Sequence, residues 1–245
     1  TMKETSNTMN EVVVTALGIK RAEKALSYNV QKVGADELTR NKDANFVNSL
    51  NGKVAGVNIS KSASGVGGAT RVIMRGAKSI EGDNNVLYVI DGIPIFNFSG
   101  GTDSGIMGEG RVSSEGIADL NPEDIESINV LAGPSAAALY GSNAANGAIL
   151  ITTKKGKEGR VEISFSSAAD FSSPLLMPEF QNKYGNKLGS YESWGEKLAT
   201  PSSYDPKKDF FRTGTNFINA LTVNTGNEFN QTFASVAATN SRGIV

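Results

Sequence analysis

The side chains that could do chemistry in this sequence are carboxylates, amides and cations, because it contains no histidine and no cysteine. Without imidazole there is no histidine-based triad, no histidine-ligated zinc and no switch near neutral pH. Without thiols there are no disulfides, thiolate metal sites or cysteine nucleophiles. Paired carboxylates are the remaining catalytic alternative, and a glycosidase needs two acids about 5 to 10 Å apart in a cleft. No acid pair is singled out by its neighbours, so we expect no enzyme.

Two acidic segments have the composition of a cation site without its spacing. Asp103, Glu109 and Glu115 lie in a glycine- and serine-rich stretch, residues 97–116, and do not match the calcium-loop pattern D-x-[DN]-x-[DN]-G-x5-E. Residues 81–85 contain two acids and two asparagines, which suit either a hard cation or a plain turn, and the turn is favoured. We therefore expect no metal and no cofactor.

A glycine-rich loop and one arginine complete the candidates. Gly65, Gly67 and Gly68 resemble a phosphate-binding loop in composition, but a strand follows them instead of a lysine, a hydroxyl residue and a helix, so nucleotide binding is not expected. Arg75 ends the apolar stretch RVIM. Its guanidinium can bind a facing carboxylate in bidentate geometry, although a solvated arginine is the simpler alternative.

Short strands and helices must position these residues. Apolar segments predict strands at residues 28–33, 57–59, 71–74, 85–95, 125–131 and 148–153, with short helices at 35–40 and 44–50. Gly133 and Pro134 are expected to end the strand before them. The three alanines in residues 136–139 then predict a slim helix that can lie close to a sheet, with Ser135 as its cap and Tyr140-Gly141 at its end.

After residue 160 the pattern changes to long alternating strands. Apolar and polar residues alternate over residues 161–171 and 217–224, and more weakly over 229–239. A long polar loop, residues 172–216, separates the first two strands, and a tight turn at Gly226 separates the last two. This long-and-short rhythm is typical of outer-membrane barrels, while a soluble β-sandwich also alternates.

The N-terminal residues contain one short apolar segment. EVVVTA, residues 11–16, is either an edge strand of the local domain or a strand that pairs with the sheet edge of another protein. The basic and small residues after it predict a solvated connection. The sequence contains no run of about 18 apolar residues, so no transmembrane helix is expected. A net charge of -1 gives no reason to expect nucleic acid as a partner.

Three blocks together resemble a known family. RVIMRG at residues 71–76, NVLYVIDGIPI at 85–95 and IESINVLAGPSAAALYGSNAANGAILITTKKG at 125–156 have the order and spacing of the plug domain of TonB-dependent outer-membrane transporters. The residues of these blocks are most similar to those of the SusC-like branch, which imports nutrients in Bacteroidetes-type bacteria. The resemblance implies an α+β plug domain, a small mixed sheet with short helices, followed by the first antiparallel strands of a transmembrane β-barrel of about 22 strands. It divides the chain into a leader at 1–27, a plug at 28–157, and about three barrel strands at 158–245, with an extracellular loop at 172–216; most of the barrel is expected to lie outside this sequence.

The resemblance also assigns residues to functions. It places the Ton box, the segment that binds TonB, at Glu11, Val12, Val13, Val14, Thr15 and Ala16. It implies that the strand at 57–59 is the first central strand. It also implies that Arg75 locks the plug to carboxylates of the barrel wall, while Ala132 occupies a position where the family often has a second cation. It also implies that three turns between strands, at residues 62–69, 77–85 and 96–111, face the substrate. Their candidate contact residues are Ser64, Gly65, Lys78, Asp83, Asn84, Asn97, Asp103 and Arg111.

The implied function is TonB-dependent active import of a polar nutrient, an oligosaccharide or peptide, across the Gram-negative outer membrane, without covalent chemistry. The implied partners are the TonB C-terminal domain, outer-membrane lipid and a SusD-like surface lipoprotein, which the loop containing Trp194 would contact. The alternative is a surface or secreted carbohydrate-binding or adhesion module without transport.

Overall fold

The computed structural model describes residues 12–14, 20–22, 30–40, 42–61, 68–79, 84–95 and 116–245. The chain divides into two compact units, Thr1–Ala168 with Ile218–Ala238, and Ala169–Phe217 with Thr239–Val245. Within the described ranges, no helix is both long and apolar enough to cross a membrane.

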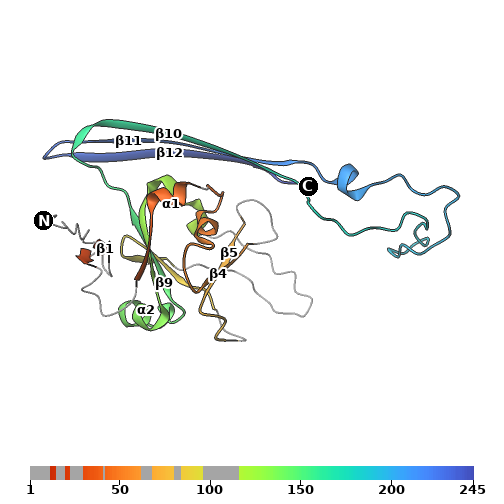
Figure 1. The fold of residues 1–245 in the computed structure, drawn as a ribbon, viewed down its shortest axis with the longest axis horizontal. Helices are drawn as coiled ribbons and strands as arrows, with labels where there is room; N and C mark the ends of the chain where they lie inside the picture. The colour runs from red at the N-terminus through yellow and green to blue at the C-terminus, as the bar shows by residue number, and fades with distance from the viewer. Residues whose placement is uncertain are drawn as a thin grey trace, which may run out of the picture. The chain divides into compact units, whose positions relative to one another are not determined.

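A five-stranded mixed sheet forms the centre of the first unit, in the order β3-β8-β9-β6-β7 (Figure 1). Its strands are β3 (Val30–Gly34), β6 (Leu87–Ile90), β7 (Ile93–Ile95), β8 (Ile125–Leu131) and β9 (Ala148–Thr153). β6 and β9 run parallel, and every other neighbouring pair is antiparallel. Strands β3 and β7 are therefore the edges of this sheet.

Both faces of the sheet are buried. Alternate residues of β9 point to opposite sides, so that Ile149 and Ile151 join one hydrophobic cluster and Ala148 and Leu150 join another. The first cluster packs the sheet against α1 (Ala35–Thr39), the 3-10 helix η3 (Phe46–Leu50) and strands β4 (Val57–Lys61) and β5 (Thr70–Met74). This double burial explains the nearly continuous apolar sequences of β6, β8 and β9.

The second cluster lies under α2 (Gly133–Tyr140), which has the small residues that such packing requires. Ala136 and Ala144 are fully buried, and a Cβ added to Gly133 would lie 2.4 Å from the carbonyl oxygen of Ala145. The helix begins one turn earlier than expected: Ala132 is its N-cap and no side chain caps it. The prediction that Ser135 caps this helix is therefore wrong, because Pro134 fits the first turn, where its missing N–H is not needed.

Strands β4 and β5 form a separate two-stranded sheet. The expectation that the strand at 57–59 is central is wrong, because its hydrogen bonds go to β5 alone among the described strands. Asn45 joins this sheet to η3: its Oδ1 accepts from the Val47 N–H, and its Nδ2 donates to the Gly68 carbonyl and to the Thr70 hydroxyl. Short 3-10 helices η4 (Gly116–Asp119), η5 (Pro122–Asp124) and η6 (Ser142–Ala144) complete the plug.

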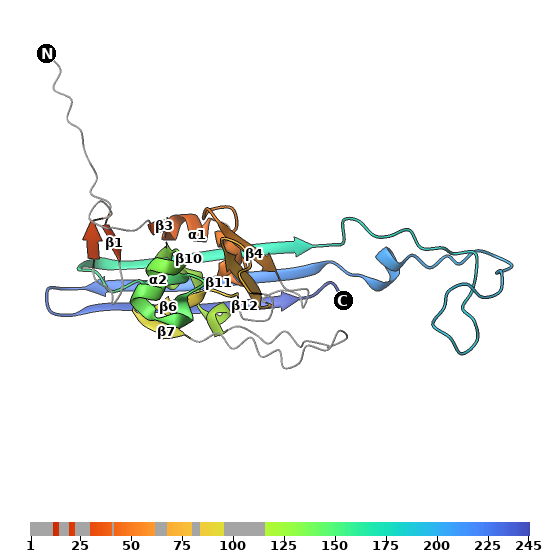
Figure 2. The ribbon, with the colours of Figure 1, turned by 90° about the horizontal axis from the view of Figure 1, so that it is seen from below.

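Three long antiparallel strands follow the plug: β10 (Gly159–Ser172), β11 (Gly214–Gly226) and β12 (Gln231–Arg242). They lie side by side in this order (Figure 2). On β10 the apolar residues Val161, Ile163 and Phe165 are 63%, 66% and 69% exposed, whereas Ser166 is half-buried on the opposite face. The predicted alternation of one apolar and one polar face is confirmed. We call β10, β11 and β12 the wall strands.

Candidate functional site

The predicted Ton box is part of a short hairpin. Strand β1 (Val12–Val14) pairs antiparallel with β2 (Lys20–Ala22), with Val13 opposite Arg21. Strand β2 lies in the stretch after residue 16 for which the sequence predicts a solvated connection, and the solvation of this stretch stays a prediction. Glu11, Thr15 and Ala16 lie outside the described residues. Because the hairpin has two strands, β1 is paired along one edge only within the described part of the chain.

Arg75, the predicted lock residue, lies directly after β5 in a left-handed conformation with φ 54°. Its backbone N–H donates to the Gly56 carbonyl at 2.8 Å, which fixes the turn. The side chain is exposed and has no ion-pair partner among the described residues. Arg75 and Ala132 line the same small hollow together with Gln31. The position where the family often carries a second cation is thus adjacent to Arg75, and here it holds a methyl group.

Two of the predicted substrate-facing residues are described, and the structure brings them together. Asn84 is 5% exposed; its Oδ1 accepts from the N–H groups of Lys78 and Ser79 at 2.8 and 2.9 Å, and its Nδ2 donates to the Ser79 carbonyl at 2.7 Å. The Nζ of Lys78 donates to the Ala145 carbonyl at 3.0 Å. The Asn84 side chain therefore holds the backbone of residues 78 and 79, and the Lys78 side chain contacts the segment after η6. The other predicted turn residues, Ser64, Gly65, Asp83, Asn97, Asp103 and Arg111, lie outside the described residues.

Asp91 fixes a turn of the main sheet, although the sequence analysis did not select it as a candidate residue. Asp91 and Gly92 form the two-residue turn between β6 and β7, with φ 48° and 88°. The Asp91 carboxylate accepts from the Thr153 N–H at 3.0 Å and from its hydroxyl at 2.6 Å. This joins the edge hairpin to the end of β9. The prediction of one strand over residues 85–95 is therefore wrong, because this turn divides the segment into β6 and β7. The Asp-Gly pair between two apolar runs was the available signal.

A buried charge cluster connects the plug to the first wall strand. The Nζ of Lys42 lies 2.6 Å from Oε1 of Glu123, and their side chains are only 8% and 15% exposed. The same Oε1 accepts from the Ser166 hydroxyl of β10 at 2.9 Å. Burial by itself would raise the pKa of Glu123, but the ion pair with Lys42, the hydrogen bond from Ser166 and the charge of Lys154 lower it overall. No local motif marks these residues, because they come from three distant segments.

A second ion pair in the plug is more exposed. Lys61 Nζ lies 2.8 Å from Asp43 Oδ2, and their side chains are 61% and 29% exposed. Burial raises and hydrogen bonds from Lys61, Asn48 and the Asn45 N–H lower the pKa of Asp43, and the net change is a decrease. Among the described residues, the ion-pair and hydrogen-bond partners of Asp43 and Lys61 all lie before β5 and none lies on the wall strands.

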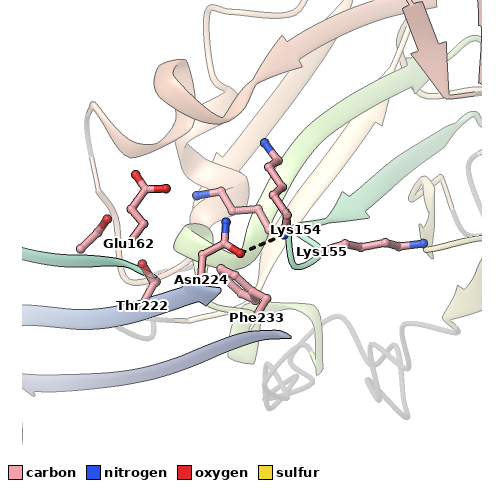
Figure 3. Close-up of a pocket in the computed structure, with 8 residues that line it drawn as sticks. Lys154, Lys155, Glu162, Thr222, Asn224 and Phe233 are labelled. Carbon is pink, nitrogen blue, oxygen red and sulfur yellow. Dashed lines mark hydrogen bonds between the residues drawn. The ribbon is translucent and has the colours of Figure 1, made fainter. Parts of the chain in front are cut away.

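A cationic hollow of about 210 Å³ lies between the segment after β9 and the wall strands (Figure 3). Its lining residues are Lys154, Lys155, Lys157, Glu162, Ser164, Thr222, Asn224 and Phe233. The backbone N–H of Lys157 donates to Asn224 Oδ1 at 3.0 Å, which ties this segment to β11. None of the three lysines has a carboxylate within ion-pair distance among the described residues. The hollow suits a hydrated polar or anionic solute.

In the second unit, the loop between β10 and β11 has internal structure. The Tyr184 and Trp194 rings lie 5.6 Å apart, and Gln181 Nε2 donates to the Tyr184 and Ser193 carbonyls. Trp194 is 64% exposed. The loop also contains the π-helix η7 (Pro206–Phe210). Several other large apolar side chains are exposed in this loop: Leu175, Leu176, Phe180, Leu188, Tyr191, Tyr204 and Phe210.

Polar residues also join the three wall strands within the second unit. Asn216 of β11 is 5% exposed and donates to Asp170 Oδ2 of β10 at 3.4 Å. Its Oδ1 accepts from the Ser241 hydroxyl of β12 at 2.7 Å. These hydrogen-bonded side chains lie on the strand face that the alternating sequence predicts to be polar.

Comparisons with known proteins agree with this architecture. The TonB-dependent Receptor Plug Domain family matches residues 22–148. The chain is 32% identical over 254 residues to the TonB-dependent receptor SusC of Bacteroides thetaiotaomicron, covering 100% of this chain and 24% of SusC. It is 39% identical over 148 residues to the ferrienterobactin receptor of Escherichia coli, covering 59% of this chain and 18% of that receptor.

Among solved structures, the RagAB peptide importer in its open-open state superposes with a TM-score of 0.70 at 23% identity, covering 96% of this chain and 28% of that one. This likeness confirms the expected fold class, a plug with a mixed sheet and short helices followed by antiparallel strands. The chain therefore spans about a quarter of the length of SusC and of the RagAB chain. With the plug family covering more than half of its residues, the chain belongs to the SusC-like TonB-dependent receptors.

Proposed function

We propose that the full-length protein imports a polar nutrient across the outer membrane, driven by TonB. The family is an outer-membrane one, and the observation that carries the proposal is the direct continuation of a plug sheet into long alternating strands. The exposed apolar face of β10, with Val161, Ile163 and Phe165, would contact lipid. The protein would move its substrate without covalent chemistry.

TonB would bind at β1. An unpaired strand edge offers backbone N–H and C=O groups to an incoming strand, so that few side chains need be particular. The pairing of β1 along one edge only supports this assignment for residues 11–16. The test is calorimetry of the TonB C-terminal domain with the full-length transporter, with and without residues 11–16. Binding that disappears with the deletion supports energised import; equal binding by both proteins contradicts the assignment.

The proposed substrate is a polar oligosaccharide or peptide. Relatives differ in the ligands their names state, a peptide for RagAB and ferric enterobactin for the Escherichia coli receptor. The glycine, serine and aspartate content of the plug turns favours hydrogen bonding to a polar ligand. Replacing Asp103 and Arg111 in the full-length protein should lower depletion of oligosaccharides or peptides from the medium. Unchanged depletion of both solute classes would exclude a substrate contact at this turn.

A SusD-like surface lipoprotein is the proposed outer partner. The loop between β10 and β11 exposes the large apolar side chains of Trp194, Leu175 and Leu176, and exposed apolar side chains of this kind are available for contact with a partner protein. Purification of the full-length protein from its own membranes should recover a lipoprotein, and Trp194→Ala should reduce the yield. Recovery of none would argue against this partner.

The Tyr184–Trp194 pair favours one alternative, a surface carbohydrate-binding module without transport. An exposed aromatic pair of this kind can stack on sugar rings. Such a module would bind glycan without TonB, so the calorimetry described above separates the two functions.

A further inference from the structure

We propose that Glu123, held by Lys42, is a polar latch that fastens the plug to wall strand β10 through Ser166. This inference rests on the proposed transport function, in which the plug must stay seated until TonB acts. It assigns part of the plug's retention to a cluster distinct from the Arg75 hollow.

The geometry joins three segments at one carboxylate oxygen. Lys42 precedes η3, Glu123 lies in η5, and Ser166 lies on β10. Oε1 of Glu123 is 2.6 Å from the lysine Nζ and 2.9 Å from the serine Oγ. One acceptor atom therefore holds a plug cation and a wall hydroxyl at the same time.

Burial makes this contact difficult to replace with water. Lys42 and Glu123 side chains are 8% and 15% exposed, whereas those of Lys61 and Asp43 are 61% and 29% exposed. When one partner of a buried pair is removed, the other charge stays buried without compensation. The exposed pair loses little, because water solvates the remaining group. The two pairs are thus matched in type and differ in burial and in contact with the wall.

The position of Lys42 along the chain gives the latch its place in transport. From β1, the chain passes β3, an edge strand that pairs only with β8 among the described strands, and then α1. Lys42 follows α1 directly. Tension applied at the N-terminus would therefore reach Lys42 after β3 and α1, and would bear on Glu123 and the wall at that point.

The test uses the full-length transporter expressed in cells without TonB, where import cannot occur. Four variants are compared: Glu123→Gln, Lys42→Met, Ser166→Ala and the control Lys61→Met. The readout is entry of vancomycin, which is too large for an intact outer membrane, together with the distance distribution between spin labels at Asp119 in the plug and Ile163 on the wall. We expect Glu123→Gln and Lys42→Met to raise vancomycin sensitivity roughly tenfold or more, the ratio for a lost hydrogen bond to a charged group.

Ser166→Ala should raise vancomycin sensitivity less, because this substitution removes one hydroxyl and no charge. Lys61→Met should leave the sensitivity unchanged. The label distance should broaden in the first three variants only. The latch would be overturned if all four variants had the vancomycin sensitivity and label distances of the original protein. It would also be overturned if Lys61→Met raised vancomycin sensitivity as much as Glu123→Gln. If Glu123→Gln does not reach the membrane, Ser166→Ala decides the matter by the same criteria. In a parallel experiment with cells that contain TonB, deletion of residues 11–16 should abolish uptake without changing vancomycin entry, so failure of the latch and failure of the transport proposal are separate outcomes.

Discussion

The carboxylate of Asp91 accepts two hydrogen bonds from one residue, Thr153, through its backbone N–H at 3.0 Å and its hydroxyl at 2.6 Å. The contact joins the turn of an edge hairpin to the last residue of a central strand, and it holds Asp91 at φ 48°. The edge strand β7 is three residues long and pairs with β6 alone among the described strands, so this contact adds to a short strand pairing.

Replacing Asp91 with alanine should loosen the edge hairpin. Alanine loses both hydrogen bonds and occupies a left-handed conformation, for a combined destabilisation of about 2 kcal/mol. Hydrogen–deuterium exchange of the full-length protein should show faster exchange in β7 and at the end of β9. Asp91→Asn is the control, because asparagine tolerates the turn and keeps one acceptor. Equal exchange in the alanine variant and the original protein would show that β6 pairing alone holds β7.

A second prediction concerns Gly133 at the start of α2. A Cβ there would lie 2.4 Å from the Ala145 carbonyl oxygen, so Gly133→Ala should displace α2 and destabilise the plug by about 1–3 kcal/mol. The control is Gly34→Ala, where φ is -79° and no atom lies within 4 Å of the added carbon. Protease cleavage of the plug in membranes should accelerate in the first variant only. Equal cleavage rates would mean that η6 moves aside.

The plug should lose stability in acid through Glu123. Its pKa is lowered in the folded protein from an ordinary value of 4.5, so its stabilising effect is complete above 4.5 and is lost as the pH falls through the lower folded pKa. Exchange in η5 should therefore accelerate below about pH 4.5 more steeply in the original protein than in Glu123→Gln, which has no titrating carboxyl. Parallel pH profiles in the two proteins would show that other carboxylates dominate. Asp43, whose pKa is also lowered, contributes in the same direction and is present in both.

The β1–β2 hairpin leads to a prediction about TonB. Val13 and Arg21 are register partners, so cysteines at both positions should form a disulfide that fixes the hairpin. If TonB adds to the unpaired edge of β1, the oxidised protein should bind the TonB C-terminal domain as well as the reduced one, because the strand is already ordered. Calorimetry with and without reductant measures this. Loss of binding on oxidation would show that TonB must displace β2 instead.

The hollow lined by Arg75 and Ala132 allows a gain-of-function test. Arg75 and Ala132 line the same hollow, and Arg75 has no carboxylate partner among the described residues. In the full-length protein, Arg75→Ala should raise vancomycin sensitivity, and Ala132→Arg should lower it if a wall carboxylate faces the hollow. Ala132→Leu is a control for size without charge. Equal effects of arginine and leucine would exclude a charge contact at this position.

Local sequence patterns determined much of this protein. The strands β6, β8 and β9, the slim helix α2 and the alternation of β10 follow from residue types that are neighbours in the chain. Their order was sufficient to identify the plug family, because each block combines a strand, a turn and a packing requirement. These features depend on backbone preference and side-chain period, which short segments carry by themselves.

Contacts between distant segments were decided only by the tertiary structure. Basic composition concealed that residues 20–22 pair with β1, and apolar composition did not reveal that β4 pairs with β5 outside the main sheet. The Lys42–Glu123–Ser166 cluster had no signal at all, since lysine, glutamate and serine are ordinary surface residues until folding buries them together. A charged side chain acquires its function from its partners and its exposure to water, and both are properties of the folded chain.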